Sequence, residues 1–379
     1  MPIPTPTMAE QPIFPTLTPA QIDATRTSAW LSTFEEITPK TSIVDLDNVG
    51  EKDAFLEWLD ADSIFIPRDS QTQPGPSHVP RVEEVEPGDD DSDTDSDSEA
   101  PVYHLPKLNE AIRQALKDRN GSVFPKLNWS APKDAAFILP QTSHGPLHCT
   151  SPADLYLLLK SSDFVSHGLD PVRAYASGES IPEESAEPER RSLPVELVLK
   201  EYVDVNPSRE MRCFVRNNVL IGISQRDSNF YDHLQSEETR ARICDTIRSL
   251  WEDEIRDQHP AMGVDYTFDV YLNPKLDDAL IIDINPYRLS TDSLLFSYPE
   301  LHSIFTQSQA PVSEITEQDR PRLPVLKVID SAAHPEASRA APAYGGNMMP
   351  LEMIEMSQGR SMEEFRDAWQ DAVARGMTE

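Results

Sequence analysis

Three polar side chains between residues 266 and 286 have types and spacing that suit a divalent cation. Asp283 and Asn285 stand two apart in the apolar run 281–286, so on a strand they project from the same face. Asp269 lies in an earlier apolar run and joins them if the two runs pair as neighbouring strands. Mg²⁺ prefers such oxygen ligands, taking one or two carboxylates together with phosphate oxygens and water. A structural alternative remains, in which Asp283 begins a turn and Asn285 caps it, because Asn-Pro commonly starts turns.

A second set of side chains has the chemistry to bind the rest of a nucleotide. Glu210 and Arg212 alternate onto one face of a predicted strand, where the carboxylate could bind a ribose hydroxyl and the arginine a phosphate. An ordinary cross-strand ion pair is the competing interpretation. Lys126 and Lys133 flank the rigid segment 128–132 and could close over a polyphosphate, although lysines are also common on surfaces.

These side chains need a folded core to position them, and the chain alternates between segments that can and cannot supply one. Four segments rich in Pro, Ser or acidic residues lack the apolar content of a core. They are a disordered N-terminus (1–20), a disordered acidic insertion (68–101), a flexible loop (171–194) and a mostly disordered tail (311–379) with a possible helix at 361–375. The remaining segments, 21–67, 102–170 and 195–310, are predicted to fold.

The folded segments combine helices with strands that are joined mainly by hairpins. Helical spacing indicates helices at 105–116, 154–160 with Ser151 as N-cap, and 239–256. Strands are predicted from residue 42 onward and at 135–139, 196–203, 211–215, 219–224, 266–272 and 280–284. Asn217-Asn218 forms a hairpin turn between two of them. The expected fold class is therefore α+β with mainly antiparallel sheets.

Composition excludes several classes of function. The 33 basic and 65 acidic side chains give a formal net charge of −32, whereas a nucleic-acid partner requires clustered Lys and Arg. Cys149, Cys213 and Cys244 lack paired spacing, so neither a disulfide framework nor a zinc site is expected, and reduced thiols fit the cytoplasm. No signal peptide and no run of about 18 apolar residues is present, so we expect no contact with a membrane.

Taken together, the candidate residues resemble the ATP-grasp superfamily over roughly residues 120–290. Residues 200–203 match its adenine-binding hinge, Glu210 its ribose acid, and Asp269 with Asp283-x-Asn285 its metal ligands. The resemblance implies two lobes with mainly antiparallel sheets that enclose a nucleotide cleft. The N-terminal lobe would comprise 21–67 and 102–170, and the C-terminal lobe 195–310.

Longer motifs resemble one eukaryotic family, the cell-division-cycle protein 123 family. The resemblance spans about 22–66 and 102–302. It rests on the motifs at 29–30, 38–43, 124–132, 154–164, 212–215, 221–227 and 291–296. The acidic insertion and the tail are not core parts of that family, and residues 286–289 lack a Gly often found after its Asn-Pro.

This resemblance implies an ATP- and Mg²⁺-binding assembly chaperone. Its partner would be the gamma subunit of eukaryotic translation initiation factor 2, whose joining with the alpha and beta subunits it would promote. Through that role it would support translation initiation and cell-cycle progression. A monomer without catalytic residues is expected. The alternatives are a carboxylate–amine ligase of ATP-grasp type and a scaffold with a relic nucleotide site.

The site residues implied by the resemblance and the spacing fall into two sets. The metal ligands are Asp269, Asp283 and Asn285. The ATP contacts are Lys126, Asn128, Trp129, Ala131, Lys133, Lys200, Glu201, Tyr202, Val203, Glu210, Arg212 and Asp227.

Overall fold

The structure is a computed structural model of the 379-residue chain. It describes residues 12–61, 65–70, 103–137, 139, 145, 147–169, 174–175, 193–311, 319–331 and 333–335. The predicted helix at 361–375 and nearly all of the acidic insertion and the loop at 171–194 lie outside these residues. Compactness divides the chain into one unit of Met1–Asp227 with Asp232–Val328 and another of Ser228–Tyr231 with Ile329–Glu379. Every element discussed below belongs to the first unit.

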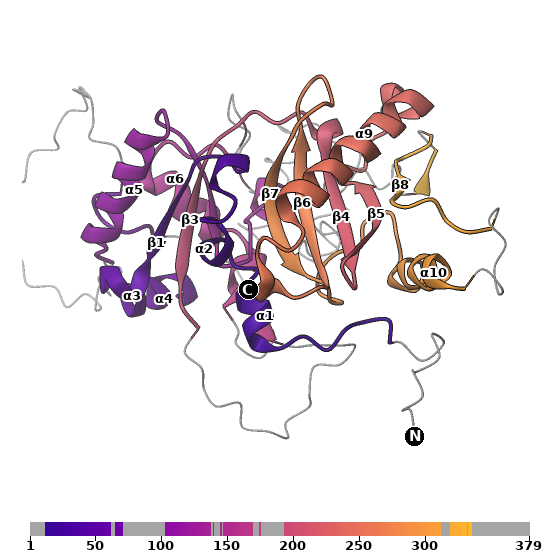
Figure 1. The fold of residues 1–379 in the computed structure, drawn as a ribbon. Helices are drawn as coiled ribbons and strands as arrows, with labels where there is room; N and C mark the ends of the chain where they lie inside the picture. The colour runs from indigo at the N-terminus through magenta and orange to yellow at the C-terminus, as the bar shows by residue number, and fades with distance from the viewer. Residues whose placement is uncertain are drawn as a thin grey trace, which may run out of the picture. The chain divides into compact units, whose positions relative to one another are not determined.

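The first unit combines helices with two β-sheets (Figure 1). Its principal helices are α1 (Pro19–Asp23), α2 (Thr27–Trp30), α3 (Leu46–Val49), α4 (Lys52–Asp60), α5 (Pro106–Asp118), α6 (Pro152–Lys160), α7 (Asp163–Gly168), α9 (Glu237–Leu250) and α10 (Tyr298–Gln309). Its strands are β1 (Thr41–Asp45), β2 (Val123–Leu127), β3 (Glu196–Glu201), β4 (Glu210–Arg216), β5 (Val219–Gln225), β6 (Tyr266–Leu272), β7 (Ala279–Pro286) and β8 (Val325–Lys327). The α+β prediction is confirmed.

The three-stranded sheet has the order β1-β3-β2, with both pairs antiparallel. Leu197 and Leu199 on β3 belong to the apolar core that α4, α5 and α6 complete beside this sheet (Figure 1). Period-2 alternation turns Lys200 to the opposite face. Lys126 lies opposite Val198 in the β2–β3 register, so Lys126 and Lys200 project from the same face.

The five-stranded sheet has the order β7-β6-β4-β5-β8. The pairs among β4, β5, β6 and β7 are antiparallel, and β8 joins β5 in parallel. Asn217 and Asn218 take left-handed φ values of 48° and 58° in the β4–β5 turn, as a tight hairpin with twisted strands requires. Helix α9 lies across one face of this sheet (Figure 1) and buries Ile243 and Ile247.

Local capping explains where helix α6 begins. Ser151 accepts from the backbone N–H of Asp154 while the Asp154 carboxylate accepts from the backbone N–H of Ser151. This capping box confirms the predicted N-cap of α6.

The segment 135–139 was expected to be a strand, but the structure has a 3₁₀ helix at Asp134–Phe137. The reason is tertiary, because the buried Asp134 carboxylate binds the Ser162 hydroxyl at 2.6 Å and caps α7.

Two segments differ from their sequence-based assignment. Residues 12–20 were assigned to the disordered N-terminus, yet Phe14 and Leu17 are buried and Phe14 lies against Tyr298 at a ring separation of 4.6 Å. Residues 325–327, assigned to the tail, form an edge strand. Both segments are short, and they gain order from apolar or backbone contacts with a distant sheet. Of the helices that the structure describes, none combines the length and apolar character needed to span a bilayer.

Candidate functional site

One row of residues across the five-stranded sheet brings the predicted metal and phosphate ligands together. The register places Arg212 of β4 opposite Asp269 of β6, and Asp269 opposite Asp283 of β7. Opposed residues of antiparallel strands share a face of the sheet. The expectation that Asp269 neighbours Asp283 across two paired strands is therefore confirmed.

Two lysines of the three-stranded sheet reach the same row. Lys126 forms an ion pair with the Asp283 carboxylate, and Lys200 donates to the backbone carbonyl of Ile282. Both lysines are buried, and their common face of the small sheet directs them to β7. The side chains that the sequence analysis took from separate motifs thus gather in one place.

Ion pairs extend this arrangement on the other side of Asp269. The Arg212 guanidinium binds the Asp269 carboxylate in bidentate fashion, at 2.7 Å and 2.8 Å. Arg226 Nε lies 3.2 Å from Asp269 and 3.3 Å from Glu210, and Glu210 also accepts from Lys133 at 3.1 Å. These ion pairs form two groups, which meet where Asp283 lies opposite Asp269 in the β6–β7 register. Together the eight residues are called the charged cluster: Lys126, Lys133, Lys200, Glu210, Arg212, Arg226, Asp269 and Asp283.

Burial and ion pairing set the protonation of the acids in the charged cluster. Burial by itself would raise the pKa of Asp269, but Arg212 and Arg226 outweigh it and hold that pKa well below its usual range. For Glu210, burial is likewise opposed by Lys133 and Arg226, and the net effect lowers its pKa. Both carboxylates are therefore ionised at neutral pH.

Lys200 shows the opposite balance. Burial, together with the neighbouring Lys126 and Lys133, lowers the pKa of Lys200 to about 8 against the attraction of Asp283. Desolvation disfavours an ammonium ion, and like charges add to that cost. An incoming anion would relieve both effects.

The charged cluster carries five cationic and three anionic side chains, a net charge of +2 in a chain whose formal net charge is −32. Two of the cations are guanidinium groups, which match the geometry of phosphate oxygens, and three are ammonium groups. A local excess of positive charge against a strongly negative background favours binding of a small polyanion.

The predicted magnesium ligands fit the ion by chemistry and adjacency. Asp269 and Asp283 are register partners, and Asn285 Nδ2 lies 3.4 Å from the Asp283 carboxylate. Carboxylate and amide oxygens suit Mg²⁺ together with phosphate oxygens. In the described part of the chain no three His, Cys, Asp or Glu side chains form a metal-binding group, so this set depends on Asn285 as its third donor.

Other predicted ATP contacts lie outside the charged cluster. The Asn128 side chain accepts from the backbone N–H of Glu196 and donates to the carbonyl of Pro194, both at 2.9 Å. Trp129 is buried, and its indole N–H donates to the Thr25 hydroxyl at 3.1 Å. These contacts hold the turn after β2, which positions Lys126 and Lys133 on either side of it.

The predicted hinge, residues 200–203, comprises the last two residues of β3 and the two that follow it. Glu201 accepts from Asn120 at 2.8 Å, the Tyr202 ring lies 4.5 Å from that of His148 in an edge-on arrangement, and 44% of Val203 is exposed. Ala131 and Asp227 are partly exposed.

Arg226 is the functional candidate that the sequence analysis missed. It follows β5 directly, and its backbone N–H donates to the carbonyl of Glu210 at 3.1 Å. The hairpin register pairs Met211 with Gln225, so the next residue along β5 lies beside Glu210. Counting outward from the Asn217-Asn218 turn would place Gln225 opposite Glu210. The bulge between Phe214 and Val215 shifts the register by one residue, so only the structure brings Arg226 to this position.

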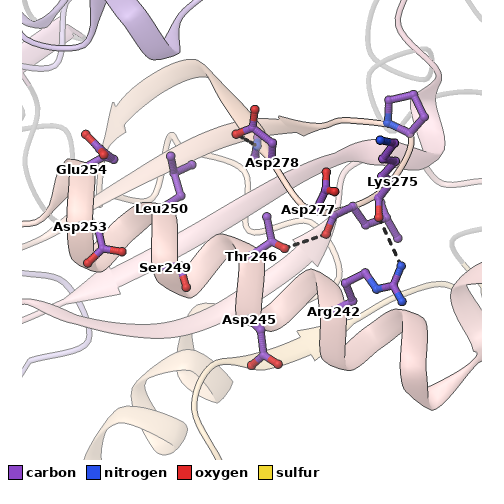
Figure 2. Close-up of a pocket in the computed structure, with 13 residues that line it drawn as sticks. Arg242, Asp245, Thr246, Ser249, Leu250, Asp253, Glu254, Lys275, Asp277 and Asp278 are labelled. Atoms are coloured by element: carbon purple, nitrogen blue, oxygen red, sulfur yellow. Dashed lines mark hydrogen bonds between the residues drawn. The ribbon is translucent and has the colours of Figure 1, made fainter.

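Apart from the charged cluster, a groove of about 880 Å³ lies between α9 and the β6–β7 turn (Figure 2). Thr246 and Arg242 donate there to backbone carbonyls of the turn. The groove contains no member of the charged cluster. Its ionisable side chains are Arg242, Lys275, Asp245, Asp253, Glu254, Asp277 and Asp278, which leave it acidic and unsuited to a polyphosphate.

Comparison with known proteins shows the family of this chain. A family model described as D123 matches residues 30–357. A protein from Emericella nidulans named "Translation initiation factor eIF2 assembly protein" is 32% identical, with 96% of this chain and 92% of the relative covered. A protein of the same name from Schizosaccharomyces pombe is 33% identical, with 94% and 97% covered. One from Phaeosphaeria nodorum, named "Cell division cycle protein 123", is 32% identical, with 90% and 92% covered.

A solved structure described as Cdc123 from Schizosaccharomyces pombe has the same fold. The two chains are 30% identical, with a TM-score of 0.57, and the match covers 83% of this chain and 98% of the other. The family match and the relatives each extend over most of the chain, and the resemblance seen in the sequence motifs is confirmed. This protein belongs to the D123 family.

Proposed function

We propose that the protein is an ATP- and Mg²⁺-binding factor for the assembly of translation initiation factor eIF2. The observation that carries the nucleotide part is the charged cluster, a set of five cations and three carboxylates with a net positive charge in an acidic chain. Four of its members are buried: Lys126, Lys200, Arg212 and Asp269. The assembly part is supported by relatives that carry the name eIF2 assembly protein at 32% and 33% identity over nearly the whole chain.

Each residue of the charged cluster has a role in this proposal. Lys126, Lys133 and Lys200 bind the phosphates of ATP, and Arg212 binds them from the other sheet. Asp269, Asp283 and Asn285 hold Mg²⁺, which would neutralise phosphate charge when bound. In the structure, Lys126 pairs with Asp283 and Arg212 pairs with Asp269. Binding of Mg²⁺-ATP would therefore exchange these ion pairs for contacts of the cations with phosphate and of the carboxylates with Mg²⁺.

The remaining parts of the proposal extend the same interpretation. The two sheets correspond to the two lobes of an ATP-grasp fold, with residues 200–203 as the adenine hinge and Glu210 on the ribose. The partner is the gamma subunit of eIF2, and the chain acts in the cytoplasm as a monomer. A role in the cell cycle is supported by the relative named cell division cycle protein 123.

The test compares binding of ATP with and without Mg²⁺ by calorimetry in wild type and in Asp283→Ala. The variant is expected to lose the Mg²⁺-dependent part of the affinity while its circular dichroism spectrum remains that of a folded chain. Asp265→Ala is a matched control, because Asp265 likewise forms an ion pair with a basic side chain, that of Arg216 at 2.6 Å, but lies outside the charged cluster. Equal Mg²⁺-ATP affinity in wild type and Asp283→Ala would contradict the metal assignment.

A second experiment addresses the assembly role. Purified eIF2 gamma subunit, immobilised on a surface, is expected to bind the full chain, with an association rate that falls as salt rises because the acidic chain is steered electrostatically. Steady release of phosphate with a small acid and amine, without binding of the gamma subunit, would instead favour a ligase.

A further inference from the structure

The ammonium of Lys200 has an aromatic partner that no motif of the nucleotide site accounts for. Its Nζ lies over the ring of Trp30, 5.5 Å from the ring centroid. Trp30 ends α2, is fully buried, and comes from the N-terminal segment rather than from either sheet. The two residues are thus brought together from positions 170 apart in the chain.

Trp30 is fixed in this position by its own indole and by contacts at the start of its short helix. Its indole N–H donates to the backbone carbonyl of Thr25 at 3.1 Å. Before it, Arg26 and Ser28 bind the two oxygens of the Glu196 carboxylate at 2.8 Å and 2.6 Å. Glu196 and Lys200 are four apart on β3 and share a face, so the strand that carries the lysine also anchors the helix that carries the indole.

The surroundings of Lys200 explain why an indole is useful there. The ammonium is buried beside two further cations, Lys126 and Lys133, and it donates to one backbone carbonyl, that of Ile282. The negative face of an indole attracts a cation without carrying a charge of its own. It therefore steadies Lys200 and leaves the positive charge available to an anion, which a carboxylate in the same place would cancel.

We propose that Trp30 is a positioning residue of the anion site, whose indole face holds the Lys200 ammonium against β7. The segment 25–30 is accordingly part of the site although it contacts no phosphate. That the ligand is a polyphosphate rests on the proposed function. That Trp30 holds Lys200 in place rests on the geometry alone.

A matched pair elsewhere in the chain provides the control. Trp58 is also fully buried, its indole N–H also donates to a backbone carbonyl, and Lys160 Nζ lies 5.3 Å from its ring centroid. Lys160 binds the carbonyls at the end of α4, so this pair is structural and outside the charged cluster. Trp58→Leu removes the same amount of side chain as Trp30→Leu from an equally buried position.

The first experiment measures Mg²⁺-ATP and tripolyphosphate affinity by calorimetry, with melting temperatures to show that each variant is folded. Trp30→Leu is expected to weaken both affinities about thirtyfold, the effect of losing a desolvated cation–π contact. Trp30→Phe, which keeps an aromatic face, should restore affinity to within about threefold of wild type. Trp58→Leu should lower the melting temperature without changing either affinity. Wild-type affinity in folded Trp30→Leu, or equal losses in Trp58→Leu, would overturn the proposal.

The second experiment needs no ligand. Labelling of Lys200 by an amine-reactive ester, followed by mass spectrometry of the ligand-free protein, should be faster in Trp30→Leu than in wild type and Trp30→Phe. Equal labelling rates in all three would also overturn the proposal. If wild type binds neither Mg²⁺-ATP nor tripolyphosphate, the proposed function fails, and this labelling alone decides whether Trp30 positions Lys200.

Discussion

Replacing Asp269 by asparagine tests whether the charged cluster is organised around this carboxylate. The side chains of Asp269 and Arg212 are 2% and 7% exposed, and the carboxylate accepts three guanidinium N–H groups at 2.7, 2.8 and 3.2 Å. Asparagine keeps the shape but removes the charge and turns an N–H₂ group toward the guanidinium. Breaking a buried ion pair by removing one partner costs about 3–5 kcal/mol.

That range can be refined from the contacts that remain. Arg226 keeps Glu210, and Arg212 keeps the backbone carbonyl of Asp292 at 2.8 Å, so neither guanidinium loses every partner. We therefore expect a loss of about 3 kcal/mol, at the lower end of the range. For a unit of this size, such a loss corresponds to a fall in melting temperature of about 6–12 °C.

The assay is urea unfolding at several pH values, with Asp245→Asn as control. Asp245 pairs with Arg248 on the surface and is 71% exposed, so its loss should cost less than about 1 kcal/mol. Burial would raise the pKa of Asp269, but Arg212 and Arg226 hold it well below the usual range. Its stabilisation is thus fully present above about pH 4, the ordinary aspartate value, and is lost as pH falls further.

The difference between wild type and Asp269→Asn should accordingly be constant from pH 5 to 7 and shrink below about pH 4. A difference under about 1 kcal/mol at pH 7 would refute the argument, since surface ion pairs contribute that little. A difference that grows as the pH falls would refute it as well.

Two further changes test the burial of the small sheet's lysine and the packing of the large sheet. Burial lowers the pKa of Lys200 from 10.5 to about 8, so between these values the unfolded chain binds more protons and the stability of wild type should rise with pH, by about 3 kcal/mol relative to Lys200→Met. Parallel stability curves for the two proteins between pH 7.5 and 10.5 would disprove this. Gly222→Ala should cost about 1–3 kcal/mol in thermal unfolding, because the added methyl meets Leu301 and Phe296 at 3.1 Å in a packed interior; an unchanged melting temperature would mean that these side chains can move aside.

Local pattern alone was sufficient for most of the helices and strands and for the faces on which the candidate ligands lie. Alternation in an apolar run predicted that Asp283 and Asn285 share a face with Asp269 beside them, and the β6–β7 register agrees. Asn217-Asn218 predicted the hairpin because asparagine tolerates left-handed backbone, and Ser151 predicted the start of α6 by its capping chemistry. Each of these features depends on residues a few positions apart, whose interactions are set by backbone geometry.

Tertiary structure alone decided which of these elements meet. The pairing of Lys126 with Asp283 spans 157 residues, and the contact of Trp30 with Lys200 joins a short N-terminal helix to a central strand. The helical state of 134–137 and the strand at 325–327 likewise depend on distant partners, Ser162 and β5. No local pattern encodes such contacts, because the free energy that selects them comes from burying and pairing whole faces of two sheets at once.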